Sequence, residues 1–323
     1  MLKTMISAAL ALVGAVVYGA ADFLGGLAAT RLRSIVVTAA AALSGLLALV
    51  VAQPLIGGIW TAADVAWGAL AGGFGVIAVV LLYACLAIGP MSILSPLTAV
   101  VSAIAPMAWG LLVDGETLSP VAYAGLGVAL VAVVLVGFIP GDKVVRPSTR
   151  GLLMAIGAGL AIGGFLIVID QTSPDSGLVP LVMSRATTAV ITVAIVAVLA
   201  AVAVRRGRGA ASALTPSGPT IGATPSGHAD LEHASTTAAV VTTPSLAAAW
   251  WLAIACGVVD AAANALLLVA LRTGDLSIVS ALTALYPAGT ILLAAIVLRE
   301  RVAAVQWIGL ALALVAGGLL ALG

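Results

Sequence analysis

Long apolar runs follow one another through most of this sequence, and they constrain the fold more than any other feature. Ten stretches of about 20 residues carry almost no charge and are separated by short polar or Gly–Pro segments. A helix needs about 20 apolar residues to cross the hydrocarbon core of a bilayer, and only helices or closed barrels satisfy their own backbone polar groups there. The sequence therefore predicts an all-α integral membrane protein with ten transmembrane helices.

The expected helices fall into two sets of five. The first run continues well beyond the apolar core of a signal peptide, so we expect it to be retained as a helix. Small residues spaced by four, such as Gly68 with Gly72 and Gly159 with Gly163, predict close contacts between helices. The ten runs cover about 5–30, 34–52, 64–88, 91–113, 119–139, 151–170, 178–204, 246–271, 276–298 and 302–322.

Composition excludes several classes of function. Hydrophobic residues make up 63% of the chain and charged residues only 8%, too little charge for the surface of a soluble domain. The net charge of +1 and the scattered aromatic residues argue against a nucleic-acid partner. We find no glycine-rich phosphate loop and no catalytic Ser/His pair, so neither ATP-driven transport nor an enzyme is expected. No cofactor is expected, and Cys85 and Cys256 are interpreted as small core residues.

An internal duplication relates the two sets of helices. Residues 89–99 and 274–284 are identical at seven of eleven positions, and the shared residues include glycine, serine and threonine. Each copy continues into an apolar run and then a glutamate, Glu116 or Glu300, with a glycine nine residues further on. Matches of these residue types are uncommon by chance in so apolar a chain, which indicates a true repeat.

The duplication predicts the domain organisation. We expect a first five-helix repeat at 1–140, a polar and basic loop at 141–150, and a second five-helix repeat at 151–323. Because each repeat has an odd number of helices, the two copies would cross the membrane in opposite directions, as inverted repeats. In transporters built this way the substrate binds between the repeats, near the middle of the bilayer.

One segment of the second repeat departs from the pattern. Residues 205–245 are rich in Ala, Gly, Ser, Thr and Pro and have no apolar periodicity, so we predict a disordered loop between the seventh and eighth helices. His228, Glu232 and His233 lie within it. Without a regular spacing or a fold to position them, these three residues do not predict a metal site.

Charged residues inside helices mark the candidate site, because each costs about 2.5–3.5 kcal/mol at the centre of a membrane helix. Three qualify, namely Asp22 in the first helix, Arg185 in the seventh and Asp260 in the eighth. Asn264 follows Asp260 by one helical turn and shares its face. We predict that these four residues bind substrate or couple a proton. The structural alternative is a set of buried hydrogen bonds, with Arg185 in a salt bridge that joins the halves.

Polar side chains on the fourth and ninth expected helices extend the predicted site. Pro96, Pro106 and Pro287 interrupt these two helices, and a proline is tolerated in lipid only where protein or a cavity satisfies the carbonyl that it frees. The hydroxyl groups have a structural alternative too, because they can bond back to a carbonyl one turn earlier. The predicted cavity-lining residues are Tyr18, Tyr83, Ser95, Thr98, Ser102, Ser280, Thr283 and Tyr286.

Asp260 is predicted to be the residue whose charge state controls transport. It is the acid nearest to the expected midplane. A neutral carboxyl costs less to bury than a charged one, which needs water, a cationic substrate or Arg185 beside it. Protonation of Asp260 would therefore bias which side of a cavity opens.

In these features the chain resembles the EamA-type transporters of the drug/metabolite transporter superfamily. The resemblance rests on Tyr18-Gly-Ala-Ala-Asp22-Phe23 in the first helix, on the Gly-x-x-Ser openings of the fourth and ninth helices, and on the glutamates that precede the fifth and tenth. Arg185, early in the seventh helix, also matches the family. The resemblance covers nearly the whole chain apart from the long loop.

The resemblance implies a function as well as a fold. It implies a pseudosymmetric bundle with a central cavity, in which a secondary transporter moves a small polar or amphipathic metabolite by alternating access, as an exporter or exchanger. It also implies a multi-pass protein of the plasma membrane, with the lipid bilayer and a small-molecule substrate as its partners, and it leaves a homodimer open.

Two other classes of function stay open at this point. The first is a receptor or structural subunit without a transport cycle, which a flux assay in liposomes would separate from a transporter. The second is an intramembrane aspartyl protease in which Asp22 and Asp260 share a proton. The residues around these two aspartates lack the sequence settings of such enzymes.

Two arguments disagree on the orientation in the membrane. With a cytoplasmic amino terminus, only Lys3 and Arg272 among the basic residues would lie on the cytoplasmic side, against ten on the other. The positive-inside rule therefore favours both termini outside, whereas the resemblance implies both inside. We favour termini outside on the charge excess. A cysteine placed at Ser217 that reacted only from the cell exterior would contradict this orientation.

Overall fold

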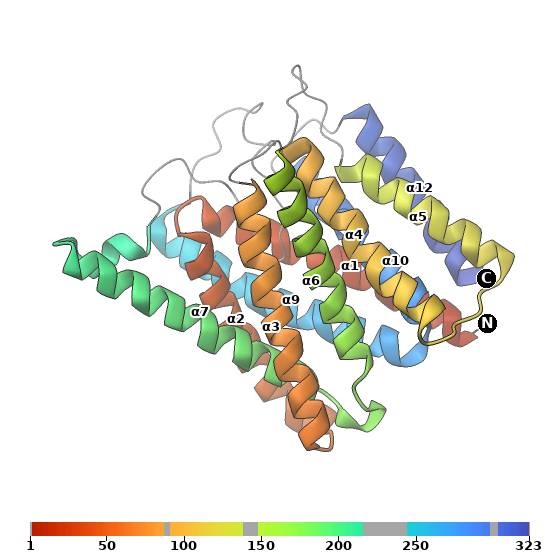
Figure 1. The fold of residues 1–323 in the computed structure, drawn as a ribbon, viewed down its shortest axis with the longest axis horizontal. Coiled ribbons are helices and arrows are strands. Elements are labelled where there is room, and N and C mark those ends of the chain that lie inside the picture. Colours follow the sequence, from red (N-terminus) through yellow and green to blue (C-terminus); the bar gives the residue numbers. More distant parts are fainter. Residues whose placement is uncertain (1, 87–90, 138–147, 216–243, 298–302, 323) are drawn as a thin grey trace.

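The computed structural model describes residues 2–86, 91–137, 148–215, 244–297 and 303–322, and these are helical almost throughout (Figure 1). In chain order the elements are α1 (Leu2–Ala29), α2 (Ser34–Ile56), α3 (Ala62–Leu86), α4 (Met91–Leu112), α5 (Pro120–Gly137), α6 (Thr149–Asp170), the 3₁₀ turn η1 (Pro174–Ser176), α7 (Val179–Arg205), the 3₁₀ turn η2 (Ala210–Ala213), α9 (Leu246–Thr273), α10 (Leu276–Thr283), α11 (Tyr286–Val297) and α12 (Ala304–Leu322).

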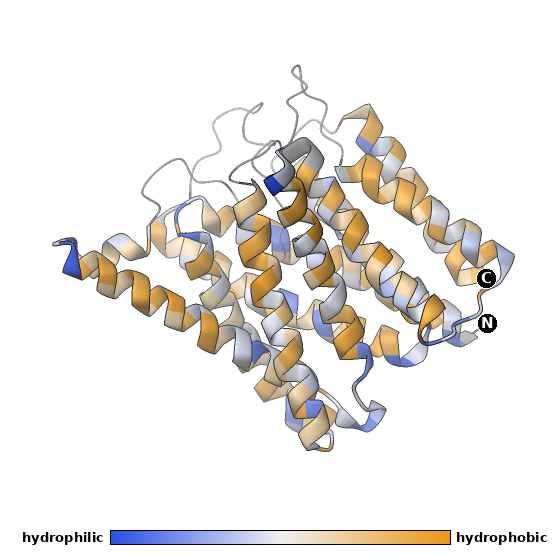
Figure 2. Ribbon diagram, in the orientation of Figure 1, coloured by the Kyte–Doolittle hydropathy of each residue, from blue (hydrophilic) through white to orange (hydrophobic). Residues whose placement is uncertain are grey.

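The described helices have the length and polarity of a membrane bundle. Nine segments are long and apolar enough to cross a bilayer, when α10 and α11 are counted as one. The remaining predicted span is α4, whose part Pro96–Leu112 is apolar but shorter. Large apolar side chains such as Leu153, Val190 and Leu314 are exposed on the outer faces, and Figure 2 shows hydrophobic residues along the lengths of the helices. The predicted all-α membrane fold is confirmed, and the described residues contain about nine to ten apolar helices where ten were predicted.

The helix predicted at 276–298 is broken in two. α10 ends at Thr283, Ala284 and Leu285 form a turn, and α11 begins at Tyr286. Pro287 explains the break, because it has no N–H to donate to the carbonyl of Thr283, four residues earlier. The expectation of one continuous helix is corrected accordingly. The break lies in the protein interior, where a freed carbonyl can find a partner.

Helices of the two halves pack against each other in matching pairs. α1 lies along α9 and α11, as α6 lies along α3 and α4. α2 contacts α9, as α7 contacts α3. The pairs α2 with α7 and α5 with α12 join a helix to its own counterpart, and Figure 1 shows α5 and α12 side by side at one edge of the bundle. Exchanging each helix for its counterpart in the other half therefore reproduces this set of contacts.

Glycines allow close approach at several of these contacts. A Cβ atom on Gly68 of α3 would lie 2.5 Å from the carbonyl oxygen of Pro180 in α7. A Cβ atom on Gly159 of α6 would lie 2.6 Å from the Cβ of Val101 in α4. Membrane helices associate through such small residues, since lipid offers no hydrophobic drive for helix contact. Both glycine pairs predicted to mark close contacts lie at helix interfaces.

Part of the segment expected to be disordered has a defined structure. The turn η2 follows α7, the backbone N–H of Arg33 donates to the carbonyl of Leu214 at 2.9 Å, and the Nε of Arg31 donates to the carbonyl of Pro244 at 3.0 Å. The α1–α2 connection thus holds both ends of the long loop. The remainder, 216–243 with its two histidines, lies outside the described residues.

Gly72 and Gly73 give a matched test of this packing. A Cβ atom on Gly72 would collide with the carbonyl of Ser184 and lie 2.8 Å from the Cβ of Thr187, both in α7, whereas one on Gly73 has open space around it. We predict that Gly72→Ala destabilises the protein by about 1–3 kcal/mol, the usual cost of overpacking, and that Gly73→Ala does not. Thermal unfolding in detergent measures the difference, and equal unfolding temperatures for the two variants would contradict this packing.

Candidate functional site

A cavity of about 140 Å³ lies among helices of both halves, and its walls come from α1, α2, α3, α4, α6, α7, α9, α10 and α11. Most of the lining surface is apolar, with a smaller polar part. Eight residues predicted from the sequence line it, and they come from six helices of both halves. They are Tyr18, Ser102, Arg185, Asp260, Asn264, Ser280, Thr283 and Tyr286.

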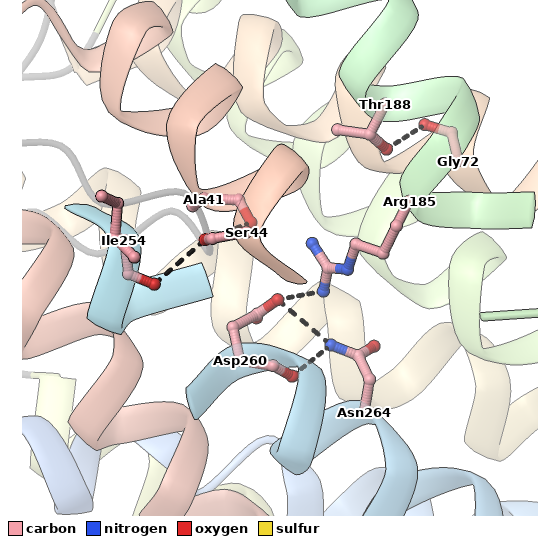
Figure 3. A network of polar contacts seen from close by, with 8 residues as sticks. All are labelled: Ala41, Ser44, Gly72, Arg185, Thr188, Ile254, Asp260 and Asn264. Atoms are coloured by element: carbon pink, nitrogen blue, oxygen red, sulfur yellow. Dashed lines mark hydrogen bonds and ion pairs between the residues drawn. The ribbon is translucent and has the colours of Figure 1, made fainter. Parts of the chain in front are cut away.

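An ion pair forms the polar centre of this cavity. The Nη2 of Arg185, from α7, donates to the Oδ2 of Asp260, from α9 (Figure 3). The Nδ2 of Asn264 donates to the backbone carbonyl of Asp260 at 2.8 Å and lies 3.4 Å from its Oδ2. Asn264 therefore restrains the carboxylate from the same face of α9, as the four-residue spacing predicts. From its position in the sequence, Asp260 could have reached toward α1 or α7. In the structure it pairs with Arg185 of α7.

Both members of the pair are withdrawn from bulk solvent. The side chain of Asp260 is 8% exposed and that of Arg185 is 17% exposed. Removing two charges from water costs several kcal/mol per ion, and their mutual attraction offsets this cost only when the geometry and the remaining hydrogen bonds are good. An unpaired charge left at this depth would be strongly unfavourable, so each residue depends on the other.

Local structure in α7 sets the direction of Arg185. The helix begins after η1 with Pro180 in its first turn, a position where the missing N–H costs nothing. Ser184 and Thr188 lie on the same face as Arg185 and also line the cavity. The hydroxyl of Thr188 donates to the carbonyl of Gly72 in α3 at 3.3 Å, which fixes this face of α7 against the other half (Figure 3).

The hydroxyl groups of the predicted polar stripes differ in what they bond. Ser102 donates to the carbonyl of Ala99 at 2.8 Å, and Ser280 donates to the carbonyl of Ser277 at 3.1 Å, which is the structural alternative foreseen for them. Thr283 is different, because its buried Oγ1 has no hydrogen-bond partner within the described part of the chain. A buried unpaired hydroxyl is costly, so Thr283 is suited to meet a ligand.

Four predicted residues are placed elsewhere or are not described. Asp22 is completely buried in α1 but is not among the residues that line the cavity. Thr98 donates to the carbonyls of Leu94 and Ala155, so it joins α4 to α6 instead of facing the cavity. The side chains of Tyr83 and Ser95 lie outside the described part of the structure.

Other lining residues were not predicted. Ser184 and Thr188 flank Arg185 at spacings of one and three, and the helical period around that arginine could have identified them. Thr38 of α2 lines the cavity as well, and its hydroxyl donates to the carbonyl of Ser34 at 2.9 Å. Phe165 is an apolar lining residue in an apolar helix, and the sequence carries no signal that separates such a residue from one facing lipid.

The cavity wall is amphipathic. α3 and α6 contribute small or apolar residues, whereas α7, α9 and α10 contribute the ion pair, the amide and the hydroxyls. Small-molecule sites commonly combine an apolar lining with a few converging polar groups. Such a wall fits a small ligand that has a charged or polar group and an apolar part. A shared-proton dyad finds no support in this geometry, since Asp260 pairs with a cation.

Comparison with known proteins agrees with this architecture. Residues 235–322 match the model of the EamA-like transporter family. The match covers α9 to α12, which include Asp260, Asn264 and the broken helix. No curated protein matches the sequence.

The fold is similar to that of a solved structure over most of the chain. One crystal structure is similar with a TM-score of 0.62 at 16% sequence identity, and the similarity covers 94% of this chain and 97% of the other. At this identity the likeness concerns the fold alone. That structure is described as "Crystal structure of protein".

The ion pair can be tested by a double-mutant cycle. We predict that Arg185→Met, which leaves Asp260 buried without its cation, destabilises the protein by up to about 3–5 kcal/mol. The double variant Arg185→Met/Asp260→Leu should recover much of this loss, because no charge remains to be buried. Thermal unfolding in detergent measures the cycle, with Arg205→Met as a control for an exposed arginine of the same helix. Purely additive effects would show that the pair is not coupled.

Proposed function

We propose that this chain is a secondary-active transporter that moves a small polar or amphipathic metabolite through the central cavity. The match of residues 235–322 to the EamA-like transporter family supports this proposal. The family supports a membrane transporter of the drug/metabolite transporter kind. The observation that carries the finer proposal is the Arg185–Asp260 pair, buried in an amphipathic cavity between the two halves.

We also propose that the two halves are inverted repeats. The support is the duplicated sequence around residues 89–99 and 274–284, together with the helix contacts, which are reproduced when the halves are exchanged. Five helices per half would place the copies in opposite orientations and the cavity on their common axis. In such an architecture one half rocks against the other around a fixed central site.

A ligand would act on the buried charges in a definite way. Arg185 and Asp260 satisfy each other in this conformation, and a ligand with an anionic or cationic group would replace one of them. Asn264 and Thr283 then offer amide and hydroxyl groups for orientation, and the wall from α3 and α6 receives the apolar part. When a ligand replaces the internal partner, its interaction energy differs between the two conformations of the transporter. A ligand can shift a conformational equilibrium only through such a difference.

The break between α10 and α11 supports a change of conformation. α10 carries Ser280 and Thr283 into the cavity wall and ends there, so a small rotation about the turn moves these hydroxyls relative to α11. Discontinuous helices at the substrate site are common in transporters of inverted-repeat design. The proposed transporter acts in the plasma membrane as an exporter or exchanger.

Flux through reconstituted protein tests this function. Proteoliposomes are loaded with a labelled panel of small polar and amphipathic metabolites, and efflux and counterflow are measured. Counterflow distinguishes a transporter from a receptor, because only a protein with a transport cycle exchanges label across the membrane. Absence of flux for the whole panel with well-folded protein would argue for the receptor alternative.

Asp260→Asn should abolish most of this flux. The protein should remain folded although Arg185 loses its partner, because Arg185 is the more exposed member of the pair. The asparagine keeps the shape of the side chain and removes the charge that pairs with Arg185. If Asp260 is protonated during the cycle, the residual flux also loses its pH dependence. The titratable and charged groups near Asp260 are Arg185 from α7, Tyr18 and Asp22 from α1, and Cys256 on its own helix.

The matched control for this substitution is Asp175→Asn. Asp175 is an exposed acid in η1, and its replacement changes the net charge equally without touching the cavity. Normal flux in Asp175→Asn is expected. A variant Asp260→Asn with the flux and the pH profile of the unmodified protein would show that the residue is a structural hydrogen-bonding group.

A further inference from the structure

The connections at one end of the bundle join its two halves through polar contacts. The backbone N–H of Ile59, in the α2–α3 connection, donates to the carbonyl of Asp175 at 2.9 Å. The backbone N–H of Ser173, after α6, donates to the Oδ1 of Asp64 in α3 at 2.7 Å. The α4–α5 and α9–α10 connections meet at this end too, through Glu116, so we call it the Glu116 end. In this conformation the halves are therefore held together at the Glu116 end.

α10 separates the cavity from the Glu116 end. All eight of its residues are buried, from Leu276 to Thr283. Its last turns carry Ser280 and Thr283 into the cavity wall, while its first turn lies against the α4–α5 connection. α10 therefore extends from the Glu116 end to the wall of the cavity, and it packs against α4 and α5 of the first half.

The amino terminus of α10 is capped by a residue from the other half. The Oε1 of Glu116 accepts the backbone N–H of Leu276 at 2.6 Å, and its Oε2 accepts that of Ser277 at 3.1 Å. Glu116 lies 160 residues earlier in the chain, in the α4–α5 connection. A carboxylate at a helix amino terminus satisfies otherwise unpaired N–H groups and interacts favourably with the helix dipole.

A residue suited to cap α10 from within its own half stands at the start of the helix, but its side chain does not cap it. Asp275 occupies the N-cap position, with φ of −73° and ψ of 137°, and its side chain makes no capping hydrogen bond. This side chain is exposed. Aspartate is among the best N-cap residues, and from this backbone conformation its carboxylate can accept the N–H of the second or third residue of the helix. α10 thus has two carboxylates within reach of one amino terminus, and one of them is in use.

We propose that α10 is a gate operated by an exchange of caps, an inference that rests on the proposed alternating access. In the closed state Glu116 holds α10 from the other half. When the halves part at the Glu116 end, the Asp275 carboxylate takes over the N–H of Ser277 and then that of Ile278. The first turn of α10 therefore remains capped in both states, and opening does not leave a bare helix terminus.

In this exchange each of the two acids has its own role. Backbone N–H groups that lose their partners in a buried place are costly, so a gate held by Glu116 alone would open rarely. A gate capped by Asp275 alone would lack a reason to close, since nothing would attract α10 to the first half. Two competing carboxylates give two states of similar free energy, as a transport cycle requires.

Gly110 offers a way to disturb the closed cap without removing a charge. The backbone N–H of Glu116 donates to the carbonyl of Gly110, so the two residues are packed together at the end of α4. A Cβ atom on Gly110 would lie 2.5 Å from the Oε2 of Glu116. The side chain of Gly110→Ala would therefore displace the carboxylate from α10 while every acid is retained.

Distances between spin labels report how far the two halves are apart at the Glu116 end. Labels are attached at Val113→Cys, in the α4–α5 connection, and at Val269→Cys, near the end of α9, because both side chains are more than 40% exposed, at 59% and 45%. The two buried cysteines, Cys85 and Cys256, are first replaced by alanine. Double electron–electron resonance on the full chain in nanodiscs then gives the populations of short and long distances.

Glu116→Gln should increase the population of long distances about fivefold, the factor that corresponds to the loss of a typical helix cap. Gly110→Ala should act in the same direction with no change of charge. Asp114→Asn is the matched control, an exposed acid of the same connection that has no bond to α10, and it should leave the distribution unchanged. Adding Asp275→Ala to Glu116→Gln should reverse part of the increase, because the open state then has no cap.

Two results would overturn the exchange of caps. The first is a distribution in Glu116→Gln and Gly110→Ala that equals that of the unmodified protein. The second is an Asp275→Ala change without effect in the Glu116→Gln background. The measurement needs no substrate, so it stays interpretable if the flux assays fail. Conversely, normal flux with either of these two results would remove the cap exchange and leave the transporter in place.

Discussion

Every polar group of the backbone must find a partner within the protein where the chain crosses lipid, and this constraint organises the structure. It makes each long apolar run a helix, and it confines irregular backbone to the interior. The turn between α10 and α11 obeys it, since Ala284 and Leu285 are buried among other helices. Close contacts between helices follow as well, because lipid provides no hydrophobic drive for helix association. Glycines such as Gly19 and Gly289 let the backbones of two helices touch.

The same constraint decides where charge can be placed. Arg185 and Asp260 are stable in the buried cavity because each offsets the other, and Asn264 holds the carboxylate from one turn away. At the Glu116 end the carboxylates of Asp64 and Glu116 accept backbone N–H groups. The interior thus contains a charge pair that a ligand can compete for, whereas this end contains carboxylate caps that movement of the helices can exchange.

Much of this architecture could be predicted from the sequence, because lipid makes length and apolar character decisive. The intramembrane charges were equally visible, and three of four predicted core residues, Arg185, Asp260 and Asn264, meet in one cavity. Asp22 shows the limit of prediction from the sequence. Its position along α1 could be predicted, but the side of the helix that would line the cavity could not. Apolar lining residues such as Phe165 were not predictable, because in a chain this apolar a residue facing a cavity and one facing lipid look alike.

α10 connects the two functional regions because it is short and rigid. Its eight residues run from the amides bound by Glu116 to Thr283, which lines the cavity about two turns along the helix. A helix of this length moves as one body. A ligand that bonds Thr283 and a carboxylate that caps Leu276 therefore both affect the position of α10. Binding in the cavity is then linked to the state of the Glu116 end without any intervening chain of contacts, because both sites bias the position of one element.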